Sequence, residues 1–135
     1  MPARQSLLGK STIEWLLEEG DPSVRYLTLR DLLNRRESDP EVQAATEAVS
    51  NSKLLTKIFS KQNPKGFWEE SGNPYHPKYK SSYWQIMILG QLGASKADKR
   101  IEKACEHVFQ FQHEEGGFPS SPKERALKEY EWVQK

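Results

Sequence analysis

The stretch Gln62-Asn63-Pro64-Lys65-Gly66-Phe67-Trp68 has a near copy fifty residues later, Gln112-His113-Glu114-Glu115-Gly116-Gly117-Phe118. The glutamine, one glycine and the closing aromatic residue recur in register at that spacing. A fixed period of this size is typical of repeat proteins, in which each repeat is one supersecondary unit that stacks on its neighbour. The two copies therefore predict an array of similar units between about residues 50 and 120.

The three recurring residue types suit the junction between one helix and the next element. A glutamine amide can hydrogen-bond to backbone groups that a helix end leaves free. A glycine permits a turn that other residues resist, and an aromatic ring can pack back over the junction. We therefore expect a structural role for the six motif residues: Gln62, Gly66, Trp68, Gln112, Gly116 and Phe118.

The chain has 135 residues, of which 36% are hydrophobic and 29% are charged. This composition is typical of a polar protein that can fold. This length suits one domain, so we expect a single helical-repeat domain over residues 1–135. The net charge of +1 disfavours nucleic acid as the main partner. Cys105 is the only cysteine, which excludes an intrachain disulfide and fits a reducing compartment. With no signal-like or membrane-spanning apolar run, the chain is predicted to be soluble and cytoplasmic.

Apolar residues recur with helical spacing along the chain, and no segment alternates with the period of a strand. Helix starts are predicted at Asp21-Pro22, at Asp39-Pro40 and at Asp98, because aspartate caps a helix and proline suits its first turn. Ser11 is predicted to cap the first helix, with Glu14 as its capping-box partner. Further helices are expected around Leu54–Phe59, over Tyr83–Leu92 with Gly93 ending it, and from Pro122.

The predicted fold is therefore all-α: about seven helices in stacked antiparallel hairpins, forming a partial α/α toroid or an α-solenoid. The helix over Tyr83–Leu92 is apolar on almost every side, which is typical of an interior helix. The helix from Pro122 keeps an apolar pattern up to the last residues, including Tyr130 and Trp132. This pattern predicts self-association or a protein partner at the C-terminal helix, or a chain that is a truncated portion of a longer toroid.

The doubled Gln-x-x-x-Gly motif with its closing aromatic resembles the QW repeat of the squalene cyclase and prenyltransferase superfamily. The resemblance includes the helices that lead into the motif, Lys57-Ile58-Phe59-Ser60-Lys61-Gln62 and the stretch from Lys103 to Gln112. It implies paired helices around an apolar hollow and, by analogy, an isoprenoid-like substrate. The second copy departs from the family pattern, because it ends in Phe118 where the family has Trp. A weaker resemblance, at residues 21–33, is to the Asp-Pro-x-Val-Arg start of a HEAT repeat.

The residues that carry out the family's reactions have no counterpart in the chain. Its cyclases use clustered aspartates, whereas the aspartates here are isolated, and its protein prenyltransferases use an Asp, Cys and His zinc site. Cys105 and His107 lie two residues apart on a predicted helix, about 200° around its axis, so they cannot hold one metal together. Cys105 is expected in the core and His107 on the polar face. We predict no catalytic residue, no metal and no cofactor.

The longest break between helices, residues 62–80, leads into a segment rich in aromatic side chains. Two interpretations stay open. The rings either pack this segment onto the helix that follows, or they form one wall of an apolar pocket or a contact patch. The candidate residues for binding a ligand or partner are Trp68, Tyr75, His76, Tyr79, Tyr83 and Trp84.

The sequence therefore predicts a non-catalytic helical-repeat protein that acts by protein–protein association or by binding an apolar small molecule. The alternative is an enzyme, or an enzyme subunit, that acts on an isoprenoid-like substrate, which rests on the family analogy alone. A third hypothesis is contact with nucleic acid through Arg25, Arg30, Arg35 and Arg36. The competing and favoured interpretation of these arginines is a solvated, ion-paired helix face.

Overall fold

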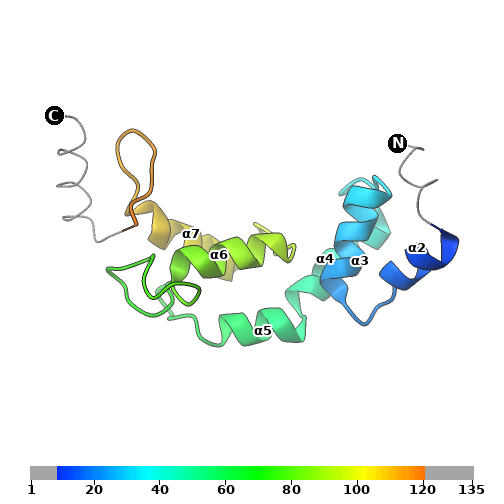
Figure 1. Ribbon diagram of the computed structural model, residues 1–135, viewed down its shortest axis with the longest axis horizontal. Coiled ribbons are helices and arrows are strands. Elements are labelled where there is room, and N and C mark those ends of the chain that lie inside the picture. Colours follow the sequence, from blue (N-terminus) through cyan, green and yellow to red (C-terminus); the bar gives the residue numbers. More distant parts are fainter. Residues whose placement is uncertain (1–8, 121–135) are drawn as a thin grey trace. The chain divides into compact units, whose positions relative to one another are not determined.

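A computed structural model describes residues 9–120, which form six α-helices and one π-helical turn and no strand (Figure 1). The prediction of an all-α protein is confirmed for this part of the chain. The arrangement as a toroid or solenoid stays a prediction. The predicted helix from Pro122, with the self-association surface assigned to it, lies outside the described residues.

The elements follow one another as helices joined by short segments and one long loop. In chain order they are α2 (Lys10–Leu16), α3 (Pro22–Leu27), η1 (Thr28–Leu32), α4 (Pro40–Ser50), α5 (Lys53–Phe59), α6 (Ser82–Gln91) and α7 (Lys99–Phe109). They build two compact units. Unit 1 comprises residues 9–56 and Gly90–Ser95, and unit 2 comprises Lys57–Leu89 and residues 96–120. The single domain expected over residues 1–135 stays a prediction.

The three predicted aspartate caps all form. Asp21 accepts a hydrogen bond from the Val24 amide at 3.1 Å. Asp39 accepts one from the Glu41 amide at 2.8 Å, which lowers the pKa of the Asp39 carboxyl. Asp98 accepts one from the Arg100 amide at 3.0 Å. Each bond satisfies one of the backbone donors that a helix start leaves unpaired, so these residues fix where α3, α4 and α7 begin.

The predicted cap of the first helix is wrong. The α2 helix begins one residue before Ser11, with Gly9 at its N-cap and no side-chain cap bond. The Gly9 carbonyl accepts from the amides of Thr12 and Ile13, which places Ser11 inside the first turn. The proposed capping-box partner, Glu14, lies instead 3.9 Å from the Lys10 ammonium.

Unit 1 is centred on α3, η1 and α4. Its buried apolar side chains come from these three elements and, in the case of Leu55, from α5: Tyr26, Leu29, Val42, Ala45, Val49 and Leu55. Gly93, predicted to end the helix after Leu92, has a φ of 87° and lies against the Tyr26 ring. A Cβ atom at Gly93 would come within 2.6 Å of Tyr26 Cδ1, so both the conformation and the packing require glycine there.

The second helix contains a feature that the apolar pattern did not predict. It widens into the π-helical turn η1, in which the Leu33 amide donates to the Thr28 carbonyl five residues back. At the junction, the Thr28 hydroxyl donates to the Val24 carbonyl at 2.7 Å. Such back-bonding by threonine competes with the backbone and bends helices, which accounts for the change of helix type at Thr28.

Unit 2 packs the aromatic residues around the first motif copy against α7. Its buried apolar side chains are Phe59, Phe67, Trp68, Leu89, Ala104, Val108 and Phe111. His107 is buried among them, so its expected place on a polar face is wrong. The His107 ring lies 5.0 Å from the Phe67 ring and 5.6 Å from the Phe111 ring, measured between centroids, and its Nε2 lies 2.9 Å from the Ser71 carbonyl oxygen.

Candidate functional site

The two motif copies fold into the same turn. In the first, Gln62 Nε2 donates to the Gly66 carbonyl at 3.0 Å, and in the second Gln112 Nε2 donates to the Gly116 carbonyl at 2.9 Å. The glycines have φ values of 104° and 96°, which only glycine adopts readily. The glutamine side chain therefore closes the turn in both copies by donating to the carbonyl of the motif glycine.

The aromatic pair beside each turn is repeated as well. Phe59 and Trp68 have ring centroids 6.3 Å apart with planes at 34°. Phe109 and Phe118, fifty residues further on, have centroids 6.3 Å apart with planes at 42°. The replacement of Trp by Phe118 therefore preserves the pair, although it loses the hydrogen bond that Trp68 Nε1 donates to the Ile58 carbonyl.

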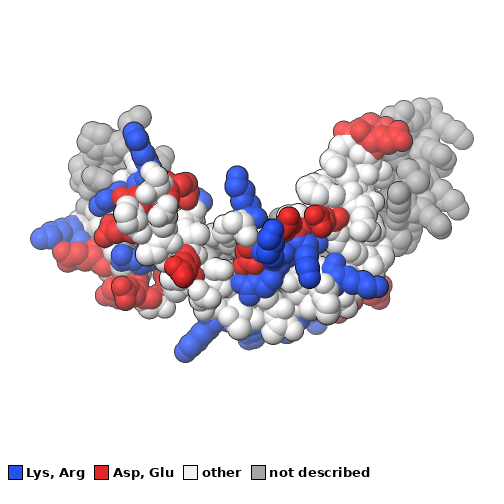
Figure 2. All heavy atoms as spheres, turned by 180° about the vertical axis from the view of Figure 1, so that it is seen from behind, with Lys and Arg blue, Asp and Glu red and all other residues white. Residues whose placement is uncertain are grey.

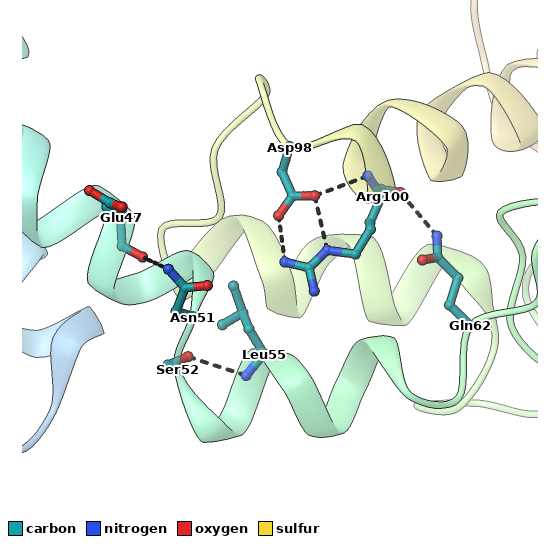
Figure 3. Close-up of polar contacts among 7 residues, drawn as sticks. All are labelled: Glu47, Asn51, Ser52, Leu55, Gln62, Asp98 and Arg100. Atoms are coloured by element: carbon teal, nitrogen blue, oxygen red, sulfur yellow. Dashed lines mark hydrogen bonds and ion pairs between the residues drawn. The ribbon is translucent and has the colours of Figure 1, made fainter.

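The first turn is covered by the start of α7 (Figure 3). Gln62 Nε2 also donates to the Arg100 carbonyl at 3.0 Å. Gly66 lies so close to α7 that a Cβ atom there would come within 2.5 Å of the Lys103 carbonyl oxygen. The Arg100 guanidinium lies 3.9 Å from the centroid of the Phe59 ring and pairs with Asp98 at 2.7 Å. These contacts leave Phe59 only 8% exposed and Trp68 only 2% exposed.

No described residue covers the second turn in this way. Phe109 is 58% exposed and Phe118 is 45% exposed. A Cβ atom at Gly116 would meet nothing nearer than Gln112 Nε2, at 3.8 Å. The Gln112 amide donates only to Gly116 within residues 9–120, whereas Gln62 donates to two carbonyls. Among residues 9–120, the same structure is thus part of the core in one copy and exposed in the other.

The open copy forms one side of an apolar groove of about 510 Å³ within unit 2. Its walls come from the long loop, from α6, from α7 and from the segment after the second turn. The lining residues are Tyr75, Tyr83, Trp84, Ile86, Met87, Cys105, Val108, Phe109, Phe118, Pro119 and Ser120. A volume of this size with a mostly apolar lining is typical of sites that bind a small molecule or an anchoring side chain.

Burial shifts the pKa of two side chains that line the groove. Burial raises the pKa of Tyr83 to about 12 and raises the pKa of the Cys105 thiol, because each charged form loses its hydration. The Tyr83 hydroxyl is enclosed and has no hydrogen-bond partner within the described part of the chain. Both groups are therefore protonated at neutral pH, and the Tyr83 hydroxyl can still donate to an acceptor.

Three of the six aromatic candidates meet at the groove, namely Tyr75, Tyr83 and Trp84. The packing interpretation holds for the same segment, because Trp84 Nε1 donates to the Tyr75 carbonyl at 2.9 Å. Trp68 is buried in the core of unit 2 and not among the lining residues. Tyr79 packs on Trp84 and His76 packs on Tyr75, each at 4.8 Å between ring centroids, without lining the groove.

Sequence reasoning missed the contributions of α6 and of the residues around the second copy. The α6 helix was expected to be interior on all sides, but Met87 is 56% exposed on the groove. The available signal was that α6 is apolar on almost every side. Such a pattern fits a helix that is buried all round, but it equally fits a helix with one apolar face exposed on a groove. For Phe109 the signal was its position, fifty residues after Phe59.

The remaining hypotheses concern metals, membranes and nucleic acid. Within residues 9–120 no cluster of three His, Cys, Asp or Glu side chains could hold a metal ion. No helix in the described part is long and apolar enough to cross a membrane. Arg30 pairs with Asp31 at 2.6 Å and Arg35 with Asp39 at 3.1 Å, while Arg25 donates to the Leu17 carbonyl. Over most of the face in Figure 2, acidic and basic side chains are interspersed.

No protein-family model matches the sequence, and comparisons with curated proteins and with solved structures gave no significant match. The resemblance to the QW repeat therefore stays a prediction that rests on the motif residues themselves.

Proposed function

We propose that the chain is a non-catalytic helical-repeat protein, of the type found in cyclase and prenyltransferase toroids, that acts by binding a partner or apolar ligand in the groove of unit 2. The observation that carries the proposal is the second copy of the turn, where Phe109 and Phe118 are exposed although their equivalents form part of the core. Exposed and contiguous apolar surface of this kind marks interaction sites.

The chemistry of the lining favours binding over catalysis. Two of the titratable side chains that line the groove, Tyr83 and Cys105, lie partly buried in it. Because burial raises the pKa of both, neither supplies a base or a thiolate at neutral pH. The alternative of an enzyme acting on an isoprenoid-like substrate would need a reactive group other than Tyr83 and Cys105.

The groove can be tested with an environment-sensitive apolar dye, such as an anilinonaphthalene sulfonate, added to the 135-residue chain. We expect saturable binding that Met87→Glu abolishes, because a carboxylate would then have to be desolvated in the groove. Leu54→Glu is the matched control, since Leu54 is 50% exposed on α5 and does not line the groove. Dye binding that is absent, or that is unchanged by Met87→Glu, would contradict the proposal.

A further inference from the structure

In the first copy, the Gln–Gly–aromatic turn binds the start of the α7 helix, which shows what kind of element such a turn can bind. The α7 helix presents two main-chain carbonyls, that of Arg100 to Gln62 and that of Lys103 against Gly66. It also lays the Arg100 guanidinium over the Phe59 ring at 3.9 Å. Four residues after Arg100, the small side chain of Ala104 is fully buried in unit 2. The first two turns of a helix therefore supply this docking.

The second turn contains an equivalent of each group that contacts α7 in the first turn. Gln112 has the same bond to its glycine and, within the described residues, no second acceptor. Gly116 has the same conformation, with space where Gly66 meets α7. Phe109 holds the same place beside its aromatic partner as Phe59 does, and the residue is 58% exposed. The receiving surface is thus repeated, and no described helix occupies its second copy.

The charge around the second turn differs from that around the first and indicates the charge of the occupant. Residues 112–120 contain two exposed carboxylates, Glu114 and Glu115, and no lysine or arginine. The equivalents in the first turn are Pro64 and Lys65. Among the residues that Figure 2 colours, those where Figure 1 draws this turn include acidic side chains and no basic ones. Complementary charge steers and orients a partner, so a basic helix start fits here.

We propose that the second turn and its groove bind the first two turns of a basic α-helix from a partner protein. Its arginine would stack on Phe109, and its backbone would approach Gly116 through a small residue, as Arg100 and Ala104 do in α7. This inference rests on the proposed function and names the partner's chemistry. The cation–ring contact and the two acidic residues give the site its preference for a basic helix over a neutral apolar molecule.

The sequence of α7 itself supplies a probe. A fluorescently labelled peptide of residues 96–110, carrying Cys105→Ser, is titrated into the full chain, and binding is followed by anisotropy. The single thiol of the chain, Cys105, lines the groove and reports occupancy through its rate of alkylation. We expect saturable binding, slower alkylation of Cys105 when the peptide is bound, and weakening by added salt because Glu114 and Glu115 attract its basic residues.

Matched variants separate the second turn from other surfaces. Phe109→Ala in the chain should weaken peptide binding at least about threefold, because the ring under the arginine is lost. Trp15→Ala should leave binding unchanged, since Trp15 is an exposed aromatic residue in unit 1. In the peptide, Arg100→Ala should weaken binding by a similar factor, and Ala104→Leu should weaken it further by blocking the close approach.

The outcomes distinguish the inference from the proposed function. If the dye binds and protects Cys105 but the peptide does not bind, the groove takes a small apolar molecule and the helix inference is wrong. If peptide binding is insensitive to Phe109→Ala, the peptide has replaced α7 at the first turn, which also overturns the inference. If Cys105 becomes more protected from alkylation when the concentration of the chain is raised without any peptide, the occupant is a second copy of the chain, and the inference of a separate partner protein is wrong. If neither probe protects Cys105, both proposals fail.

Discussion

At the scale of single residues, the two motif glycines share a conformation but differ in their surroundings. Gly66 and Gly116 have φ values of 104° and 96°, so any other residue would be strained at either position. Within the described residues, Gly66 is also pressed against another helix, at the Lys103 carbonyl, and Gly116 is not. The local turn requires both glycines, whereas helix packing requires only the first.

Substituting each glycine by alanine separates these two effects. Gly116→Ala should lower the free energy of unfolding by about 1 kcal/mol, the cost of a side chain at positive φ. Gly66→Ala should cost about 1–3 kcal/mol more, because its Cβ atom would overlap the Lys103 carbonyl and force α7 to move. Urea unfolding of the two variants measures the difference. Equal losses would mean that α7 does not rest on the first turn in solution.

At the scale of elements, sequence reasoning was most successful where one residue determines the outcome. An aspartate before a helix, or a glycine after it, acts through its own side chain or its own φ, and Asp21, Asp39, Asp98 and Gly93 behave as predicted. The same reasoning was wrong at Ser11, where the Gly9 carbonyl begins the helix earlier without any side-chain bond.

Burial was harder to predict than the positions of the helices, because burial depends on what packs against each face. His107 reads as polar in sequence but is enclosed by Phe67 and Phe111. Met87 reads as a core residue but is exposed on the groove. Of the aromatic candidates, Tyr75, Tyr83 and Trp84 line the groove, whereas most of its lining comes from α6, α7 and the residues after the second turn.

Asp98 gives α7 both its start and the orientation of Arg100, which makes it the element-scale test. Asp98→Ala removes the cap bond to the Arg100 amide together with the 2.7 Å ion pair, and should cost about 1–3 kcal/mol. Asp98→Asn retains a capping oxygen and should cost less. Asp21→Ala is the control, since Asp21 caps α3 through one amide, at a cost of about 1 kcal/mol. Thermal unfolding of these variants measures the order of their stability losses. A loss for Asp98→Ala that is no larger than the loss for Asp21→Ala would contradict the prediction.

At the scale of the whole molecule, the central claim concerns one repeated structure in two states. Both turns are closed by the same glutamine bond and flanked by the same aromatic pair. The first is covered by α7 and contributes to the core of unit 2, and the second borders an apolar groove. In a repeat protein each unit buries its apolar surface against a neighbour, so a turn that no described helix covers is where we propose that a partner binds.

Hydrogen exchange at the two equivalent glycine amides measures this difference directly in the unmodified chain. The Gly66 amide donates to the Asn63 carbonyl at 2.8 Å and the Gly116 amide to the His113 carbonyl at 2.9 Å, so the local bonds are matched. After correction for intrinsic rates, we predict that the Gly66 amide exchanges at least about tenfold more slowly, because opening the first turn requires α7 to move away. Equal protection of the two amides would contradict the account, since it would mean that the second turn is covered as well.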